Sequence, residues 1–553
     1  MIRSLLFLSS FVLPALMHAQ FNWQWARPYT SETQPSVGGL VVDAAGNSVV
    51  CGSFFGELNI GTLPVLTSNG QSDLYVAKFG SDGTPLWVRS AGGANFEEAM
   101  AVTVDGEGRI TLTGYFDSPS ITVGGTTLSR QGSMDILVAQ YDASGNAQWA
   151  RRYGWTASSG LEWGRAIVAD ANNDLYVTGQ YKTALQVPGL ADLQACNNRE
   201  QGFLMKLDAA GNGIWSLMPQ CTGDDALGLT MCNALALAPD GHVYLGGHFR
   251  GDTAYFATDT LPNFMPSGQS DDAFVVKYTP AGEEVWVRTW AGTNYDEIRS
   301  VATDSDGNIL VATTREGGYL IDGIDLPFAG SNGNYRMTLW KMDPDGTALW
   351  GRRAGNTSFS HEFNDLAVDA NDHVWAGGYY GSQCTFDNIV FPDNGNFEFY
   401  GLFAAHYDAD GVVQEVFTDR GQGPRVVNQL ACDATGGLYV AGAYTDSIAF
   451  APMPYLMGSG AYLAKSDDLS TGIASAQSEH MWSVAPVPAD AHYVITHREG
   501  APLGSVRVLD PMGREVLRTT AQAARVIIDC AAWSPGSYVV LCGDVRQRII
   551  VLH

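Results

Sequence analysis

Short apolar runs alternate with Gly-, Asp- and Asn-containing turns along most of this chain. One phrase recurs: Val-x-Asp-x-x-Gly-Asn, an apolar run, a variable loop, Asp-x-apolar-Val-Ala-Lys-Tyr-Asp-x-x-Gly, and finally Trp-x-Arg. Its first copy occupies residues 41–47, 73–78 and 87–89. The Asp-x-x-Gly phrases are typical of hairpin turns, in which Asp caps the turn and Gly takes a positive φ. Each copy therefore predicts four strands in two hairpins, the unit of a propeller blade.

Seven copies can be followed from one end of the repeat region to the other. Their first turns contain Asp43, Asp105, Asp170, Asp240, Asp304, Asp369 and Asp433. The tryptophans of the last strand are Trp87, Trp149, Trp215, Trp286 and Trp350, spaced 62 to 71 residues apart. This period exceeds the roughly 40–50 residues of common propeller repeats, and the excess lies in the variable loops.

The two ends of the repeat region complement each other. The sixth copy ends in a decayed Glu415-Val416-Phe417, and the seventh has no Trp strand. A lone Trp25-Ala26-Arg27 stands near the N-terminus instead. Placing the strand near residues 23–27 last in blade seven closes the ring and removes an open sheet edge. We therefore predict an all-β fold whose residues 20–466 form a seven-bladed β-propeller.

These phrases resemble the bacterial β-propeller repeat family known as SBBP. The resemblance covers roughly residues 21–470 and rests on Asp-x-x-Gly-Asn, Val-Ala-Lys-Tyr-Asp and Trp-Ala-Arg. It implies the fold and little about function, because one fold hosts many activities.

A second unit follows a linker at residues 467–481. Short alternating strands separated by turns predict a small Ig-like β-sandwich over residues 482–553. This segment resembles the type A sorting domain of Bacteroidota type IX secretion cargo, although the usual Pro-Asn-Pro is Pro-Val-Pro here. The residues that carry the resemblance are Pro486, Pro488, Gly513, Gly536, Tyr538 and Arg548. It implies export across the outer membrane by the type IX machinery, with the final strands acting as an address.

The N-terminus reads as a signal peptide over residues 1–19. Arg3 precedes an apolar run, and Met17-His18-Ala19 offers a cleavage site. The run is too short to anchor in a bilayer, and no later segment has the length of a transmembrane helix. The expected location is extracellular or at the outer-membrane surface.

Charge and cysteine spacing narrow the classes of partner. The net charge is −27, which disfavours nucleic acid and anionic lipid. Eight cysteines occur without any C-x-x-C pair, so a zinc ribbon is disfavoured. Some could form disulfides, and their spacing does not fix which.

No catalytic signature stands out: the chain has no Gly-x-Ser-x-Gly elbow and no Walker A loop. We therefore predict a non-enzymatic binding or structural module, with a surface glycan or protein as its partner. The alternative is a secreted carbohydrate-active enzyme, a hydrolase or lyase with carboxylates at the channel mouth.

The sharpest candidate site is a ring of carboxylates with aromatic neighbours in the loops that lead into the blades. These residues are Glu98, Glu162, Glu297 and Glu362 with Phe96, Trp163, Tyr295 and Phe363. Equivalent loops meet on one face of a propeller, so the ring could hold a sugar or a cation. The alternative is that each Glu caps its own loop.

The repeated Asp and Trp residues have structural interpretations. The Asp-rich turns offer two or three carboxylates where calcium needs six to eight oxygens, so we expect turn caps and no cofactor beyond a weakly indicated divalent cation. The repeated tryptophans could stack on sugars, but their fixed place beside Arg favours packing between blades. They are Trp25, Trp87, Trp149, Trp215, Trp286 and Trp350.

Overall fold

The structure is a computed structural model. It describes residues 23–156, 161–195, 199–219, 228–265, 270–292, 295–315, 319–326, 336–355, 361–381, 384–387, 389–391, 400–419, 421–450, 453–468, 482–485, 492–497, 504–509, 514–523, 525–530, 533, 536–542 and 545–551. The chain divides into two compact units, Met1–Ser470 and Thr471–His553. The predicted signal peptide, residues 1–19, lies outside the described residues, as do Pro486, Pro488 and Gly513 of the predicted sorting signal.

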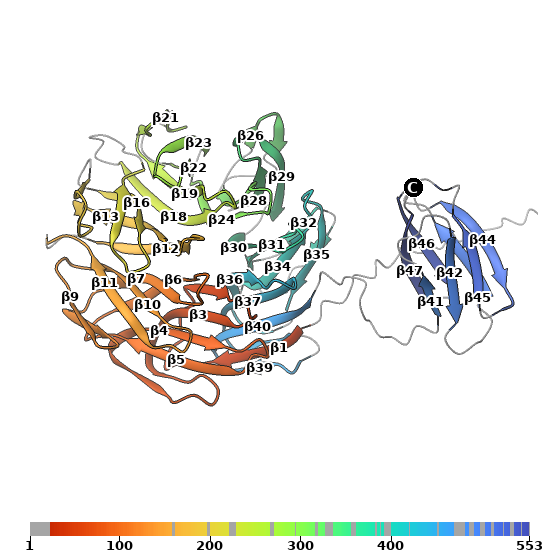
Figure 1. The fold of residues 1–553 in the computed structure, drawn as a ribbon, viewed down its shortest axis with the longest axis horizontal. Helices are drawn as coiled ribbons and strands as arrows, with labels where there is room; N and C mark the ends of the chain where they lie inside the picture. Colours follow the sequence, from red (N-terminus) through yellow and green to blue (C-terminus); the bar gives the residue numbers. More distant parts are fainter. Residues whose placement is uncertain are drawn as a thin grey trace, which may run out of the picture. The chain divides into compact units, whose positions relative to one another are not determined.

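The first unit consists of seven antiparallel four-stranded blades arranged around a ring (Figure 1). The first three blades are β2 (Gly39–Val42), β3 (Ser48–Leu58), β4 (Leu66–Phe79) and β5 (Pro85–Ala91); β6 (Glu97–Val104), β7 (Ile110–Phe116), β10 (Asp135–Tyr141) and β11 (Ala147–Tyr153); and β12 (Trp163–Ala169), β13 (Leu175–Lys182), β16 (Glu200–Leu207) and β17 (Gly213–Leu217).

Blades four to six follow the same order. They are β18 (Leu229–Leu237), β19 (Val243–Arg250), β22 (Asp271–Tyr278) and β23 (Glu284–Trp290); β24 (Glu297–Thr303), β25 (Ile309–Arg315), β28 (Arg336–Met342) and β29 (Ala348–Gly355); and β30 (His361–Val368), β31 (Val374–Tyr380), β34 (Gly401–Tyr407) and β35 (Val413–Thr418).

The seventh blade joins both ends of the propeller sequence. It consists of β36 (Arg425–Cys432), β37 (Gly437–Tyr444), β40 (Gly460–Asp468) and, as its outer strand, β1 (Trp23–Tyr29). Trp25 lies opposite Lys465 and Arg27 opposite Leu463 in this antiparallel pair, and Figure 1 shows β1 beside β40. The prediction of an all-β, seven-bladed propeller is confirmed.

The excess length of the repeat lies between the second and third strands, where six blades carry a small hairpin. These hairpins are β8 (Ser120–Val123) with β9 (Thr126–Ser129), β14 (Ala184–Leu185) with β15 (Leu193–Gln194), β20 (Thr253–Tyr255) with β21 (Thr260–Pro262), β26 (Tyr319–Ile321) with β27 (Ile324–Leu326), β32 (Cys384–Phe386) with β33 (Ile389–Phe391), and β38 (Ser447–Ile448) with β39 (Leu456–Met457).

The hydrophobic core lies between the blades. Each of the seven interfaces has its own cluster of buried side chains, drawn from two neighbouring blades. Three of the third strands, β10, β22 and β34, are buried along their whole length. A middle strand has a neighbouring blade on both faces, which explains why its sequence is continuously apolar instead of alternating.

The second unit contains two antiparallel sheets. One is β41 (Trp482–Ala485), β42 (His492–His497) and β45 (Arg525–Asp529); the other is β44 (Glu515–Ala521), β43 (Gly504–Leu509), β46 (Gly536–Cys542) and β47 (Val545–Val551). Gly536 and Tyr538 lie in β46 and Arg548 in β47. The Ig-like sandwich stays a prediction. In the part of the chain that the structure describes, no helix is long and apolar enough to cross a membrane.

Neighbouring blades are joined by the Trp-x-Arg motif, which contacts the turn between the third and fourth strands of the next blade. Trp87 Nε1 donates to the carbonyl of Ala143 at 3.1 Å, and Arg89 Nε donates to that of Gly145 at 2.8 Å. The Arg89 guanidinium lies 5.6 Å from the Trp87 ring centroid. Trp25, Trp149, Trp215, Trp286 and Trp350 make the same indole hydrogen bond to the following blade.

Both the backbone conformation and the close approach of the tryptophan require glycine in the turn of this contact. Gly145 has a φ of 80°, and a Cβ there would lie 2.7 Å from the ring of Trp87. Gly108, in the other turn of the same blade, has a φ of 77° and open space around it.

This pair separates packing from backbone strain. Gly108→Ala should lower the free energy of unfolding by about 1–2 kcal/mol through its left-handed backbone. Gly145→Ala should cost about 1–3 kcal/mol more, because the methyl group also displaces Trp87. Urea denaturation of both variants measures the difference, and equal losses would show that the Trp contact does not constrain this turn.

Candidate functional site

The first strand of each blade lies nearest the axis of the ring and contacts the first strands of the neighbouring blades. The end of this axis at which these strands begin is called the channel end. Four of these strands carry partly exposed charged side chains in their first residues: β6, β12, β24 and β30. A β-bulge interrupts each strand near its third residue, as between Ile298 and Ser300. In β24, Glu297 and Arg299 are partly exposed while Ile298 and Ser300 are buried. The alternation thus leaves two partly exposed side chains near the start of each of these strands.

Two arginines lie among the carboxylates at this end, and one of these arginines forms ion pairs with two of the carboxylates. Arg299 lies between Glu297, at 3.3 Å, and Glu362, at 3.0 Å. Desolvation of the partly buried Arg165 lowers its pKa, while the nearby carboxylates of Glu297 and Glu98 oppose the shift. The site is therefore a network of alternating charges contributed by blades two, three, five and six.

Blade four adds an imidazole. His248 is 4% exposed, and its ring, Asp271 and Glu297 each offer a ligand atom within 4.8 Å of the others. Burial lowers the pKa of His248, Arg165 and Arg299 lower it further, and the two carboxylates oppose the shift. His248 is accordingly neutral near neutral pH, the form in which an imidazole accepts a proton.

The charges around His248 disfavour a metal ion there. Arg250 holds Asp271 through two hydrogen bonds of 2.7 and 2.8 Å. Arg299 pairs with Glu297 at 3.3 Å. Both carboxylates are thus already neutralised by guanidinium groups, which repel a cation and leave donors for an uncharged or anionic ligand.

Aromatic side chains border part of this network. The Trp163 ring lies 5.2 Å from the Arg165 guanidinium and 6.2 Å from Tyr115. Tyr295 is 43% exposed beside Arg250, and Phe96 is 37% exposed. Exposed rings beside hydrogen-bonding groups are suited to stacking on a sugar.

The structure places two of the predicted ring residues elsewhere. Phe363 is fully buried in the interface between blades five and six and packs on Phe403. Glu162 is fully buried beside Asp135, and burial first, then Asp135, raises its pKa to about 9. Glu162 corresponds to Glu97 in blade two, one residue before Glu98, and both side chains are fully buried.

Glu97 shows what that buried position does. Its carboxylate accepts hydrogen bonds from the backbone N–H groups of Gly93, at 2.7 Å, and Ser118, at 3.0 Å. This is the loop-capping role that the sequence left open as the alternative for the glutamates. It applies to Glu97, whereas Glu98, Glu297 and Glu362 belong to the channel network.

The arginines and blade-four residues were missed at the sequence level. Arg165 and Arg299 both stand five residues before their turn aspartates, so a search of the repeat for charges of either sign would have found them. His248 and Asp271 carry no such signal, because they lie on the second and third strands of blade four and reach Glu297 only through packing between blades.

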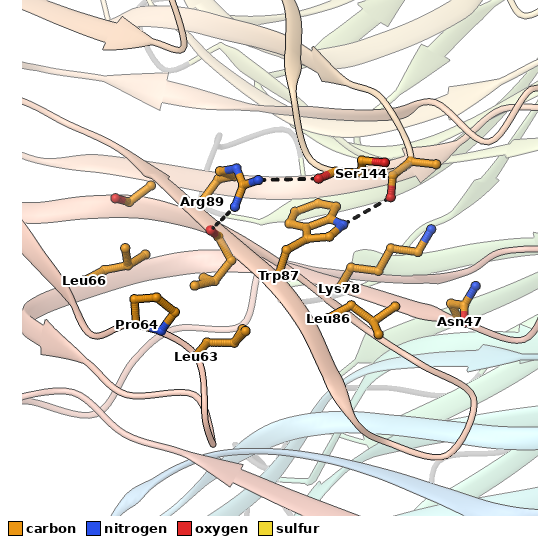
Figure 2. A pocket seen from close by; sticks show the side chains of 12 residues that line it. Asn47, Leu63, Pro64, Leu66, Lys78, Leu86, Trp87, Arg89 and Ser144 are labelled. Carbon is orange, nitrogen blue, oxygen red and sulfur yellow. Dashed lines mark hydrogen bonds between the residues drawn. The ribbon is translucent and has the colours of Figure 1, made fainter.

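The repeated tryptophans and aspartates lie outside this network. Trp87 forms part of a groove of about 980 Å³ at the seam between two blades, where its indole and Arg89 donate to the next blade (Figure 2). Asp43 accepts the backbone N–H groups of Ala45 and Asn47 and pairs with Lys78 at 2.8 Å. Its oxygens are therefore engaged within the turn.

No known family model matches the chain. Among curated proteins, it is 19% identical over 450 residues to an uncharacterised WD repeat-containing protein of Acanthamoeba polyphaga mimivirus, covering 69% of this chain and 32% of that protein. It is 26% identical over 256 residues to the regulatory protein FlaEY of Caulobacter vibrioides, covering 45% and 25%. The chain thus spans about a third or less of the length of these relatives.

Solved structures with similar folds include three enzymes. An ulvan lyase, a polysaccharide lyase, shares 11% identity and a TM-score of 0.39, covering 79% of this chain and 97% of its own. A puromycin hydrolase shares 14% and 0.39, covering 84% and 59%. A gluconolactonase of Xanthomonas campestris shares 13% and 0.30, covering 65% and 94%.

The prediction of a non-enzymatic chain is corrected by these matches. Propellers similar to this chain in fold include a lyase and hydrolases, so the lack of a recognised sequence motif is no ground for excluding catalysis. The similarity concerns the fold alone, and no activity is transferred by it.

His248 generates a pH prediction. Its folded-state pKa lies below its unfolded value of about 6.5, so the unfolded state binds a proton first as the pH falls. Wild-type protein should lose stability below about pH 6.5, by at most about 1.4 kcal/mol per pH unit from this group. His248→Gln should lose less over the same range. Urea midpoints at several pH values test this, and parallel profiles would show that His248 is freely protonated in the fold.

Proposed function

We propose that the channel end formed by Glu98, Arg165, Glu297, Arg299 and Glu362 is a carbohydrate-binding site. The observation that carries this proposal is the break in repeat symmetry there. The position of Glu98, Glu297 and Glu362 holds Trp163 in blade three, and the position of Arg165 and Arg299 holds uncharged residues in blades two and six. Structural positions of this repeat keep one residue type in most blades, whereas binding a particular ligand requires different groups in a fixed arrangement.

The chemistry of the network fits a polyhydroxylated ligand. Carboxylates accept hydrogen bonds from hydroxyl groups, and guanidinium groups donate to hydroxyl, carboxylate or sulfate oxygens. The internal ion pairs of Arg299 keep both kinds of group in place before the ligand arrives. Trp163 and Tyr295 supply aromatic faces at the border of the network.

A second function, catalysis on the bound carbohydrate, is favoured by His248. An imidazole with a lowered pKa, buried next to two carboxylates, is suited to act as a general base. Arg165 and Arg299, which depress that pKa, would stabilise negative charge that develops on a substrate. We therefore propose a lyase or hydrolase activity at the same site, with His248 as the base.

Binding and catalysis are tested together on purified propeller with a panel of neutral and acidic polysaccharides. Arg299→Met should weaken binding at least about tenfold, because it removes a charged hydrogen-bond donor worth about 1.5–3 kcal/mol. His248→Gln should abolish depolymerisation while retaining binding. Arg109→Met is the charge-matched control, because Arg109 pairs with Asp105 at the opposite end of the blade-two hairpin.

The outcomes separate the two functions. Binding that depends on Arg299 without chain cleavage supports a carbohydrate-binding protein alone. Cleavage lost in His248→Gln supports the enzyme. Equal loss in Arg109→Met would contradict both proposals, since it would reflect overall charge.

We further propose that the chain is a type IX secretion cargo, exported through its signal peptide and sorted by residues 482–553. The support is the resemblance of both terminal segments to such signals, together with the compact division of the chain at Ser470 and Thr471. The propeller would then be delivered to the cell surface or the medium, as an SBBP-type repeat protein.

Export is tested in a type IX-competent bacterium with the full chain and a variant ending at Ser470. The full chain should reach the surface or medium, whereas the shortened chain should accumulate in the periplasm, because its first signal remains and its second is lost. Immunoblots of the three fractions measure this. Equal export of both chains would contradict the sorting role of the second unit.

A further inference from the structure

Six of the seven blades share an aspartate at the start of their first turn. In five of them a lysine or arginine side chain forms an ion pair with this aspartate. The Lys of the third strand supplies that cation in four blades, through the pairs Lys78–Asp43 at 2.8 Å, Lys206–Asp170 at 3.0 Å, Lys341–Asp304 at 2.8 Å and Lys465–Asp433 at 2.9 Å. In blade two, Arg109 pairs with Asp105 at 2.6 Å. In these five blades a positively charged side chain therefore lies beside the turn carboxylate.

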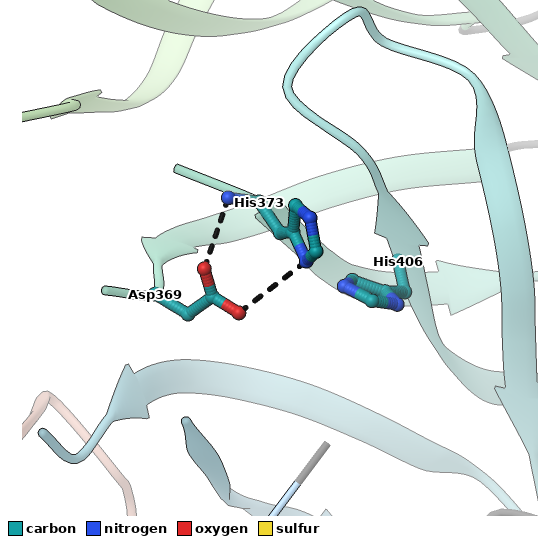
Figure 3. Close-up of side chains that lie close together, drawn as sticks. All are labelled: Asp369, His373 and His406. Carbon is teal, nitrogen blue, oxygen red and sulfur yellow. Dashed lines mark hydrogen bonds and ion pairs between the residues drawn. The ribbon is translucent and has the colours of Figure 1, made fainter. Parts of the chain in front are cut away.

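Blade six keeps the aspartate and has no lysine or arginine in these positions. Asp369 faces His373, four residues on, and His406 on β34 (Figure 3). His373 Nδ1 lies 3.6 Å from the Asp369 carboxylate, beyond a good hydrogen bond. The corresponding residues of blade one are Asn47 and Lys78. Blade six thus has two imidazoles beside the turn aspartate, and the one on the third strand stands where most other blades have a lysine.

His406 is fixed with one nitrogen unused. It is 7% exposed and stacks on Trp375 with ring centroids 4.4 Å apart. Its Nδ1 lies 3.7 Å from Glu415 Oε1. Its Nε2 is buried, with no hydrogen-bond partner in the described part of the chain. A carboxylate behind one ring nitrogen, with the other nitrogen free, is the arrangement that surrounds histidines bound to zinc.

We propose that Asp369, His373 and His406 bind a divalent transition metal ion, Zn²⁺ in the first place, which supplies the positive charge that Lys or Arg supplies in the other blades. One ligand atom from each residue lies within 4.8 Å of the others. Two imidazoles with one carboxylate suit zinc, whereas calcium and magnesium prefer oxygen alone.

The geometry needs a small adjustment on binding. Zinc bonds of about 2.0–2.1 Å place tetrahedral ligand atoms roughly 3.3 Å apart. In the structure the ligand atoms of the three residues are separated by up to 4.8 Å, so they must move closer together. The side chain of His373 is 35% exposed and can rotate inward, whereas His406 and Asp369 are held by their surroundings. A fourth ligand such as water would complete the tetrahedral coordination.

The repeat itself supplies a variant that removes the metal ligands without disturbing the fold. His373→Asn with His406→Lys gives blade six the residues of blade one, so the ion pair with Asp369 should form and the blade should stay intact. His242→Asn is the matched control: His242 occupies the position of His373 in blade four, where Lys277 remains on the third strand.

The test is Zn²⁺ binding by the purified mature chain, measured by calorimetric titration and by the thermal midpoint with and without ZnCl₂. Wild type and His242→Asn should bind the ion and gain in thermal midpoint. The double variant should bind one Zn²⁺ fewer, or at least about 100-fold more weakly at this site, and lose the gain. An unchanged stoichiometry in the double variant, or equal loss in His242→Asn, would overturn the proposal.

Discussion

The propeller depends on the contact between the last strand of one blade and the turn of the next. In this contact an indole N–H and a guanidinium N–H donate to two carbonyls of the same turn, as Trp87 and Arg89 do to Ala143 and Gly145. These carbonyls face a neighbouring blade, where an unpaired one would be costly. Because the turn glycine has no side chain, the indole can lie against the backbone. The contact thereby fixes both the spacing and the orientation of consecutive blades.

The same contact explains why the sixth repeat decays at its end. A Trp-x-Arg motif in blade six would have to donate hydrogen bonds to the turn between the third and fourth strands of blade seven. That turn does not exist, because β40 and β1 come from distant parts of the chain and are joined only by their hydrogen bonds. With no turn to hold, Glu415 and Phe417 stand where other blades have Trp and Arg. Phe417 instead packs against Trp23 of β1 across the seam.

The fold could be predicted from the sequence because each blade repeats the same turn and packing residues. Where one copy has diverged, the other copies still show which strand each residue belongs to. The candidate site was readable only in part. Glu98 and Glu297 were found because each lies seven residues before a turn aspartate. Glu162 was grouped with them although it lies eight residues before Asp170, and it is accordingly one residue out of register and buried. His248 reaches Glu297 through the packing of blade four on blade five, which no spacing along the chain encodes.

The interface between blades six and seven also accounts for the place of the histidine cluster. In most blades with an intact Trp contact, the third-strand Lys and the Trp are direct cross-strand partners, as are Lys78 and Trp87, whereas blade two has Gln140 in place of the lysine. In blade six the same pair of positions holds His406 and Glu415. Because a tryptophan in blade six would have no turn to contact, its position is not constrained to keep that residue. Its cross-strand partner on the third strand is not constrained either. Two neighbouring positions could then change together, one becoming a metal-ligand type and the other the carboxylate that orients it. Symmetry is thus broken for a structural reason at the interface of blades six and seven. At the channel end it is also broken in blades two, three and five, whose Trp contacts are intact, and there the proposed ligand accounts for it.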